Sequence, residues 1–145
     1  MSPDAPVRFG VPDRAQPESF RGRELAASLT VSDLEKSLAW YRVVLRFSIE
    51  RKHERDGVVT GVSLKAGAVR LLLEQDDGAK GKDRDKGEGF SLQITTVQDI
   101  DELAEGIKAR GGTLDSEPAD MPGGVRLFRV RDPDGFRFTI SSVRP

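Results

Sequence analysis

Apolar and small polar residues alternate over residues 25–31, and the chain then runs directly into a predicted helix start. The two faces hold Ala27, Leu29 and Val31 on the apolar side and Ala26, Ser28 and Thr30 on the other. A period of two is typical of a half-buried strand, here over about 24–31. Ser32 and Glu35 match a capping box, in which both side chains accept hydrogen bonds from free backbone N–H groups of the first turn.

The residues that follow first repeat with the period of a helix and then return to alternation. An apolar stripe predicts a helix over about 33–45, and it is formed by Leu34, Leu38, Tyr41 and Leu45. Strands are predicted after this helix at about 47–54, 58–65 and 68–75. Gly57 and Gly67 lie between these strands, where a residue that adopts positive φ permits a tight turn.

The same order of elements then occurs a second time. Residues 90–95 alternate, a helix is predicted over about 99–110, and strands follow at about 113–117, 125–131 and 136–142, with a loop at 118–124. Asp33 and Asp99 are 66 residues apart, and the turn glycines Gly67 and Gly135 are 68 apart. This offset indicates an internal duplication. We therefore predict an α+β fold of two β-α-β-β-β modules, each with a helix on the apolar face of a four-stranded sheet.

The chain is predicted to form one domain over residues 23–145, with module one at about 24–75 and module two at about 90–142. Residues 76–89 contain no aliphatic residue larger than alanine and are predicted to be a solvated linker. Residues 1–22 contain four prolines among charged residues and are predicted to be a flexible tail.

Composition excludes several classes of protein. The chain has no cysteine, so it forms no disulfide or thiolate metal site, and this favours a reducing cytoplasm. A net charge of −1 argues against nucleic acid or an anionic membrane as a partner. No apolar run approaches the roughly 20 residues of a membrane-spanning helix. A cytoplasmic protein without nucleic-acid or membrane partners is expected.

The sequence resembles the vicinal oxygen chelate superfamily, which includes glyoxalase I, extradiol dioxygenases and bleomycin-resistance proteins. The resemblance lies in residues 29–37 (LTVSDLEKS) with Trp40-Tyr41, in residues 98–103 (QDIDEL) and in residues 132–136 (DPDGF). It implies paired βαβββ modules that form a cupped mixed sheet, commonly in a homodimer with cavities near the module interface. One departure is Arg46, where the family usually has glycine, so that the helix end requires another stop or an arginine with positive φ.

Enzymes of this family hold a divalent metal with His, Gln or Glu side chains that point into the cup. The resemblance places these positions at Ala26, near Leu72, at Ser91 (Leu92 if the register differs by one) and at Thr139. Alanine and leucine cannot bind a metal, and neutral hydroxyls are poor ligands for Zn, Ni, Mn or Fe. The usual metal site is therefore expected to be absent, and no cofactor is predicted. Displaced ligands would have to come from Glu74, Glu88 or His53, the only histidine.

The predicted inward face carries hydrogen-bonding groups and two guanidinium groups. The candidate ligand-binding residues are Ser28, Thr30, Arg70, Glu74, Ser91, Gln93, Arg137 and Thr139. Arginine binds carboxylate or phosphate through a two-pronged contact, so a polar or anionic ligand is favoured. The alternative is that both arginines pair with Glu74 or neighbouring acids, or extend into solvent.

These features leave three hypotheses for function. The first is a metal-independent small-molecule-binding protein of the bleomycin-resistance type, a homodimer that holds a polar or anionic ligand, with or without an aromatic group. The second is a lyase or dioxygenase-like enzyme with a displaced metal, or with metal-free acid–base chemistry through Glu74. The third is a regulatory or scaffold module whose cup is filled by its own side chains or by the N-terminal tail.

Overall fold

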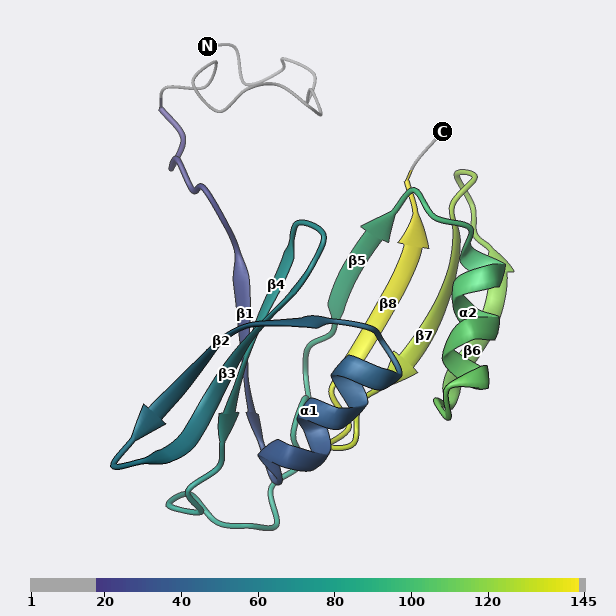
Figure 1. Cartoon of the computed structure of the whole chain (residues 1–145). Coiled ribbons are helices and arrows are strands. Elements are labelled where there is room, and N and C mark those ends of the chain that lie inside the picture. The colour runs from purple at the N-terminus through teal and green to yellow at the C-terminus, as the bar shows by residue number, and fades with distance from the viewer. Residues whose placement is uncertain (1–17, 144–145) are drawn as a thin grey trace.

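The computed structural model describes residues 18–143, and its eight strands and two helices follow the duplicated order predicted from the sequence (Figure 1). The first half contains β1 (Ala26–Val31), α1 (Leu34–Val43), β2 (Ser48–Arg55), β3 (Val58–Ala66) and β4 (Val69–Gln75). The second half contains β5 (Leu92–Thr96), α2 (Ile100–Ala109), β6 (Leu114–Asp120), β7 (Arg126–Arg131) and β8 (Arg137–Ser142).

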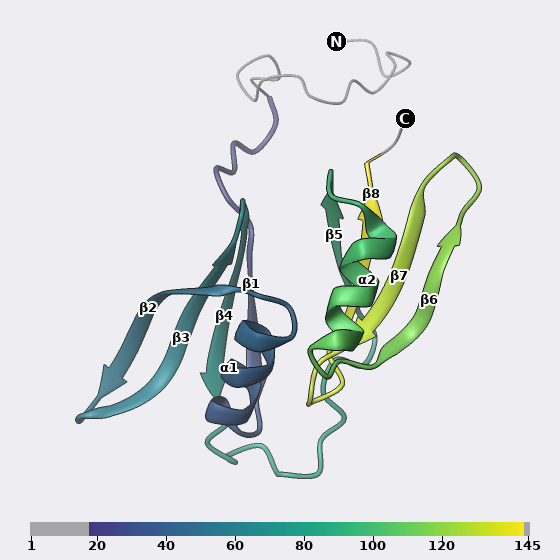
Figure 2. The same ribbon diagram turned by 45° about the vertical axis from the view of Figure 1, so that its right-hand side comes forward.

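Each half forms its own four-stranded mixed sheet, and the two sheets have the same topology. Their strand orders are β1-β4-β3-β2 and β5-β8-β7-β6. In each sheet the first strand runs parallel to the last, and the other pairs are antiparallel. Figure 2 shows the two sheets side by side, with the segment between β4 and β5 passing from one to the other. The predicted α+β fold of two βαβββ modules is confirmed.

Both helices have an aspartate as the N-cap residue. The prediction that Ser32 caps the first helix is wrong. The Asp33 side chain accepts from the Lys36 backbone N–H, and Asp99 does the same for Glu102. Ser32 precedes the cap, and its own backbone N–H donates to Asp134 instead. An aspartate next to the serine competes for the same N–H groups, and its charge is also favoured by the helix dipole.

Helix α1 ends in a backbone conformation that is unusual for its residue. Arg46 has φ 63°, the left-handed region in which glycine is favoured, and the Phe47 N–H donates to the Tyr41 carbonyl at 2.9 Å. Of the two alternatives that the sequence leaves open at this position, the structure has the arginine with positive φ.

The core is continuous between the halves, and α1 lies at their junction (Figures 1 and 2). Tyr41 is fully buried, packs edge-to-face on Phe138 of β8 at 5.9 Å between ring centroids, and donates from its hydroxyl to Asp132 at 2.7 Å. Arg110, which follows α2, donates from Nε and Nη2 to the Val44 carbonyl at the end of α1. These contacts fix the second sheet against the first helix.

The segment before β7 differs from the prediction. A loop was expected at 118–124, but β6 continues to Asp120 and includes Pro118. Proline is tolerated there because β6 is an edge strand and its pairing with β7 is irregular between Ser116 and Ala119.

The predicted tail lies mostly outside the described residues, which begin at 18. Residues 18–25 belong to no helix or strand, and Phe20 and Leu25 are 96% and 92% exposed. The described part of the chain has no helix that is long and apolar enough to cross a membrane.

Candidate functional site

The strand register places the predicted polar residues on the sheet faces opposite the core. In the first sheet Ser28 is the partner of Leu72, and Thr30 is the partner of Glu74. In the second sheet Gln93 is the partner of Thr139. Their chain neighbours Leu29, Leu73 and Phe138 are fully or almost fully buried in the core. Alternation along the strands therefore produces the polar faces that the sequence predicts.

The first polar face forms a pocket with the chain between the two sheets. This linker pocket has a volume of about 570 Å³ and is lined by Ser28, Thr30 and Glu74, by residues of the segment 75–88, and by Phe90 and Phe136. The segment is not simply a solvated linker, since Gly87 is buried and the Lys86 side chain is only 9% exposed. It forms one wall of the pocket.

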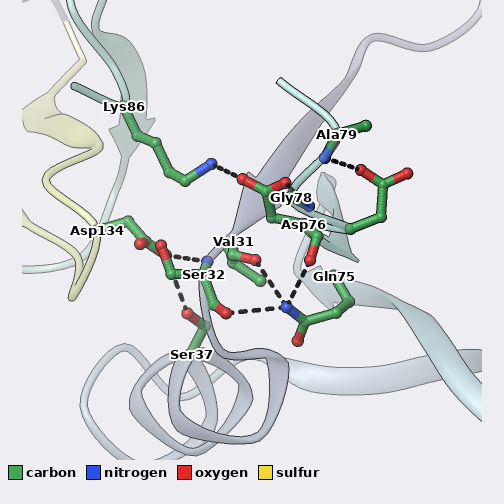
Figure 3. A network of polar contacts seen from close by, with 10 residues as sticks. Val31, Ser32, Ser37, Gln75, Asp76, Gly78, Ala79, Lys86 and Asp134 are labelled. Atoms are coloured by element: carbon green, nitrogen blue, oxygen red, sulfur yellow. Dashed lines mark hydrogen bonds and ion pairs between the residues drawn. The ribbon is translucent and has the colours of Figure 1, made fainter. Parts of the chain in front are cut away.

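Polar contacts hold this wall in place (Figure 3). The Lys86 amine is 2.6 Å from an oxygen of Asp76, whose other oxygen accepts from the Gly78 N–H. The hydrogen bond from Lys86, followed by that from Gly78, lowers the pKa of Asp76. Gln75 accepts from the Leu34 N–H at the start of α1 and donates to the Ser32 carbonyl. The end of β4 is thus joined to both the linker and the first helix.

The second polar face forms a smaller pocket with two guanidinium groups. This arginine pocket has a volume of about 320 Å³ and is lined by Gly89, Phe90, Ser91, Asp115, Arg129, Arg137 and Thr139. Asp115 pairs with Arg131 at 2.6 Å, so its charge is already balanced. Thr139 lies in β8 beside Arg129 of β7, its register partner, and two residues from Arg137. Ser91, Arg137 and Thr139 are thus brought together as a group that can bind an anion.

Two predicted site residues lie outside both pockets. Arg70 pairs with Glu24 and Glu50 at 3.0 and 3.2 Å. The alternative in which the arginine pairs with neighbouring acids is therefore the one seen for Arg70, with partners other than Glu74. These pairs raise the pKa of Arg70, with the hydrogen bond to Glu50 as the largest cause. Gln93 is exposed on β5 and lines neither pocket.

Among the pocket residues that were not predicted as site residues, Arg129 and Phe90 bear most on ligand binding. Arg129 lies between buried Phe128 and Val130, so alternation along β7 and the turn at 132–135 could have placed it opposite Thr139. Phe90 lines both pockets and is 45% exposed, with its ring 6.0 Å from that of Phe136. No local pattern marks Phe90, because its position depends on the path of the linker.

At the four positions where the resemblance expects metal ligands, the side chains present do not fit a divalent metal. Leu92 pairs with buried Phe138, so its neighbour Ser91 is the residue that lies on the polar side. The positions therefore hold Ala26, Leu72, Ser91 and Thr139, which offer two neutral hydroxyls and no charged donor. Residues 18–143 contain no group of three or more His, Cys, Asp or Glu side chains that could hold a metal.

The side chains considered as displaced ligands are not assembled into one site. Glu74 and Glu88 both line the linker pocket. His53 lies on edge strand β2, and its Nε2 is 2.9 Å from the Ser63 hydroxyl. Glu74 is exposed to solvent.

The paired modules and the cupped polar faces define a class of protein that sequence comparison identifies. The sequence model of the Glyoxalase/Bleomycin resistance protein/Dioxygenase superfamily matches residues 25–140. The chain belongs to this superfamily.

Particular relatives carry enzyme names. A probable lactoylglutathione lyase from Vibrio cholerae is 31% identical over 124 residues, which are 81% of this chain and 88% of that protein. Lactoylglutathione lyase GLX1 from Arabidopsis thaliana is 26% identical over 135 residues, 89% of this chain and 47% of that protein. The chain thus spans about half the length of the plant relatives that it matches.

Solved structures support the fold. A superfamily member from Sphaerobacter thermophilus has a TM-score of 0.69 and 27% identity, and the match covers 85% of this chain and 98% of that one. A glyoxalase I mutant from Zea mays has a TM-score of 0.70 and 26% identity, with 85% of this chain and 45% of that chain covered.

Proposed function

We propose that the protein is a metal-independent small-molecule-binding protein that holds a polar or anionic ligand against its polar faces. The observation that carries this proposal is the arginine pocket. Thr139 stands where the resemblance expects a glutamate ligand, and Arg129 and Arg137 lie beside it. Two guanidinium groups at this position repel a divalent metal cation and attract an anion. The site therefore favours a negatively charged ligand where the metal-binding members of the family favour a cation.

Phe90 extends the proposed ligand to one with an aromatic group. Its ring is partly exposed at the rim shared by the two pockets. An aromatic anion could place its charge on the guanidinium groups and its ring against Phe90. Small aromatic carboxylates and phosphates are therefore the first ligand class to test.

The proposed protein is a cytoplasmic homodimer without nucleic-acid or membrane partners. The net charge of −1 supports this choice of partners. Both pockets lie on polar sheet faces that a second copy could cover. The molar mass in solution, measured by light scattering, tests the dimer.

The proposal is tested by calorimetric titration of benzoate and phenyl phosphate into the wild type and the Arg129→Ala/Arg137→Ala variant. We expect the double variant to bind at least about tenfold more weakly, because charge-assisted hydrogen bonds are lost. Arg51→Gln, which changes an exposed arginine of β2, is the control and should bind as the wild type does. Equal binding by all three proteins would contradict the proposal.

The second candidate is a lyase or dioxygenase-like enzyme with a displaced metal or with acid–base chemistry through Glu74. It is favoured by the names of the relatives and by the presence of Glu74 and Glu88 in one pocket. Metal content, thermal melts in Mn²⁺, Ni²⁺, Zn²⁺ and Fe²⁺, and an assay of lactoylglutathione lyase activity decide between the candidates. One bound metal per chain, with a raised Tm and activity lost in Glu74→Gln, would establish the enzyme and refute the binding protein.

A further inference from the structure

A further hollow lies on the side of the second sheet that faces away from the arginine pocket. This apolar groove has a volume of about 1030 Å³ and is lined by both halves: by the segment after α1 (45–48), the β3–β4 turn (65–69), the end of β5 with the residues that follow it (94–98) and one face of α2. Ile94 and Ile140 line it, whereas Thr139, the chain neighbour of Ile140, lines the arginine pocket. Alternation therefore separates the two sites by the thickness of the sheet.

Most of the residues that line the groove are apolar, and most of these are aliphatic. Leu103 and Ile107 of α2 line it one turn apart, followed by Arg110. The distance from Leu103 to Arg110 along the helix axis is roughly 10 Å, from the rise of 1.5 Å per residue. Val97 and Val143 add 89% and 50% exposed apolar side chains at its border. This surface is suited to an extended alkyl chain rather than to a compact polar ligand.

The charged residues that line the groove are all cations. Arg46 and Arg110 both line it, with Lys65 as a third cation, and its lining residues include no Asp or Glu. Burial, and secondarily the charge of nearby Arg46, lower the pKa of Arg110. Within residues 18–143 neither Arg46 nor Lys65 takes part in an ion pair. The charges that gather here are therefore not balanced by acids of the described chain.

Arg46 is also held at a cost to the backbone. It adopts φ 63°, where glycine would be free of strain, at the position where the resemblance expects glycine. The guanidinium group of Arg110 is fixed by its bonds to the Val44 carbonyl, whereas Arg46 lies near it and has no ion-pair partner within residues 18–143. A ligand that accepts from Arg46 would give the strained residue a role.

We infer that the groove binds a single-chain amphiphile, with its anionic head at Arg46 and Arg110 and its alkyl tail along Ile107 and Leu103 toward Val97. The head is a carboxylate or a phosphate, since both match a guanidinium group. The inference does not depend on the function proposed for the polar faces.

The test is calorimetric titration of the full chain with decanoate, decyl phosphate and decanol, each below its aggregation limit. We expect one molecule of decanoate or decyl phosphate per chain and at least about tenfold weaker binding of decanol, which keeps the tail and lacks the charge. The anion that binds with the lower Kd, decanoate or decyl phosphate, shows whether the head group is a carboxylate or a phosphate. No binding by either anion, or equal binding of decanol, would refute the inference.

Variants locate the site. Arg46→Gly removes the charge, relieves the backbone and should weaken decanoate by about tenfold without changing decanol. Arg46→Lys keeps the charge and should retain most of the affinity, and Arg51→Gln should equal the wild type. An unchanged affinity in Arg46→Gly would overturn the inference, as would loss of binding in Arg129→Ala, which would place the ligand in the arginine pocket. Light scattering at the same concentrations adds a further check, because a dimer that Arg46→Gly dissociates would mean that a second copy covers the groove.

Discussion

The hydroxyl of Tyr41 donates to Oδ2 of Asp132, while Oδ1 accepts from the backbone N–H groups of Asp134 and Phe136. Both side chains are buried. Desolvation, and secondarily the charge of Asp132, raise the pKa of Tyr41, so the hydroxyl keeps its proton and remains the donor. One side-chain bond thus joins the first helix to the last hairpin.

Tyr41→Phe should lower the free energy of unfolding by about 1–3 kcal/mol, because the buried carboxylate loses one of its three donors. Urea denaturation measures the change. Asp132→Asn serves in a double-mutant cycle, in which Tyr41→Phe should cause a smaller loss once the charge at position 132 has been removed. A loss below about 0.5 kcal/mol in the wild-type background would show that water replaces the hydroxyl.

At the scale of elements, Arg110 connects the end of α2 to the end of α1, and Gly106 leaves room for its guanidinium group. A Cβ atom on Gly106 would lie 2.7 Å from Nη1 of Arg110. Because Gly106 has no side chain, the guanidinium group folds back over α2 and reaches the Val44 carbonyl, with Nε and Nη2 at 3.1 and 3.0 Å from its oxygen. Helix propensity alone favours alanine at this position by about 1 kcal/mol.

Gly106→Ala should therefore have opposite effects in two backgrounds. In the wild type it displaces Arg110, and the loss of two charge-assisted bonds outweighs the gain in helix propensity, for a net loss of about 1 kcal/mol. In Arg110→Ala the same change should stabilise by about 1 kcal/mol. Thermal and urea unfolding of the four proteins give the comparison, and stabilisation in both backgrounds would show that Arg110 adjusts freely.

Helices and strands with a clear hydrophobic period were predictable from the sequence. Features that depend on two residues competing for one role, or on contacts between elements in the folded chain, were not. All eight strands and both helices are present, because alternation and helical stripes report burial directly. The N-cap of α1 is Asp33 rather than the predicted Ser32, because two residues that can cap a helix are adjacent. Strand β6 continues through Pro118, because β6 lies at the edge of its sheet. The partner of Arg70 could not be predicted, since Glu50 reaches it across β3 only in the folded sheet.

The sequence predicted which residues lie on the polar faces of the two sheets, but not how these faces are enclosed to form pockets. The register confirms which residues share each polar face. The path of residues 76–89, which have no periodicity, divides these faces into two pockets and brings Phe90 to the rim of both. A site wall built from an irregular segment leaves no pattern in the sequence.

For the whole molecule, two aspartates give stability opposite dependences on pH. The Lys86 bond lowers the pKa of Asp76, so this contribution is present above the unfolded pKa of about 3.9 and is lost as pH falls through the folded value. Burial is the largest cause that acts on Asp132 and raises its pKa, so its contribution is present below about 3.9 and is lost as pH rises through the folded value.

Asp76→Asn and Asp132→Asn should separate these effects when urea unfolding is measured between about pH 2 and 7. The advantage of the wild type over Asp76→Asn should grow as pH rises in the acid range. Relative to Asp132→Asn, the wild type should lose stability as pH rises. Parallel curves for either variant would mean that its carboxyl group has the same pKa in the folded and unfolded chains.

The Tyr41–Asp132 bond has no counterpart in the other half. Ile107 stands 66 residues after Tyr41, and the β3–β4 turn at 66–68 contains no carboxylate. The duplicated halves have therefore become complementary rather than interchangeable. Two copies of the first half would bring together two tyrosines without an acid, and two copies of the second half an acid without its tyrosine. Co-expressed as separate fragments, the halves should pair with each other in preference to themselves.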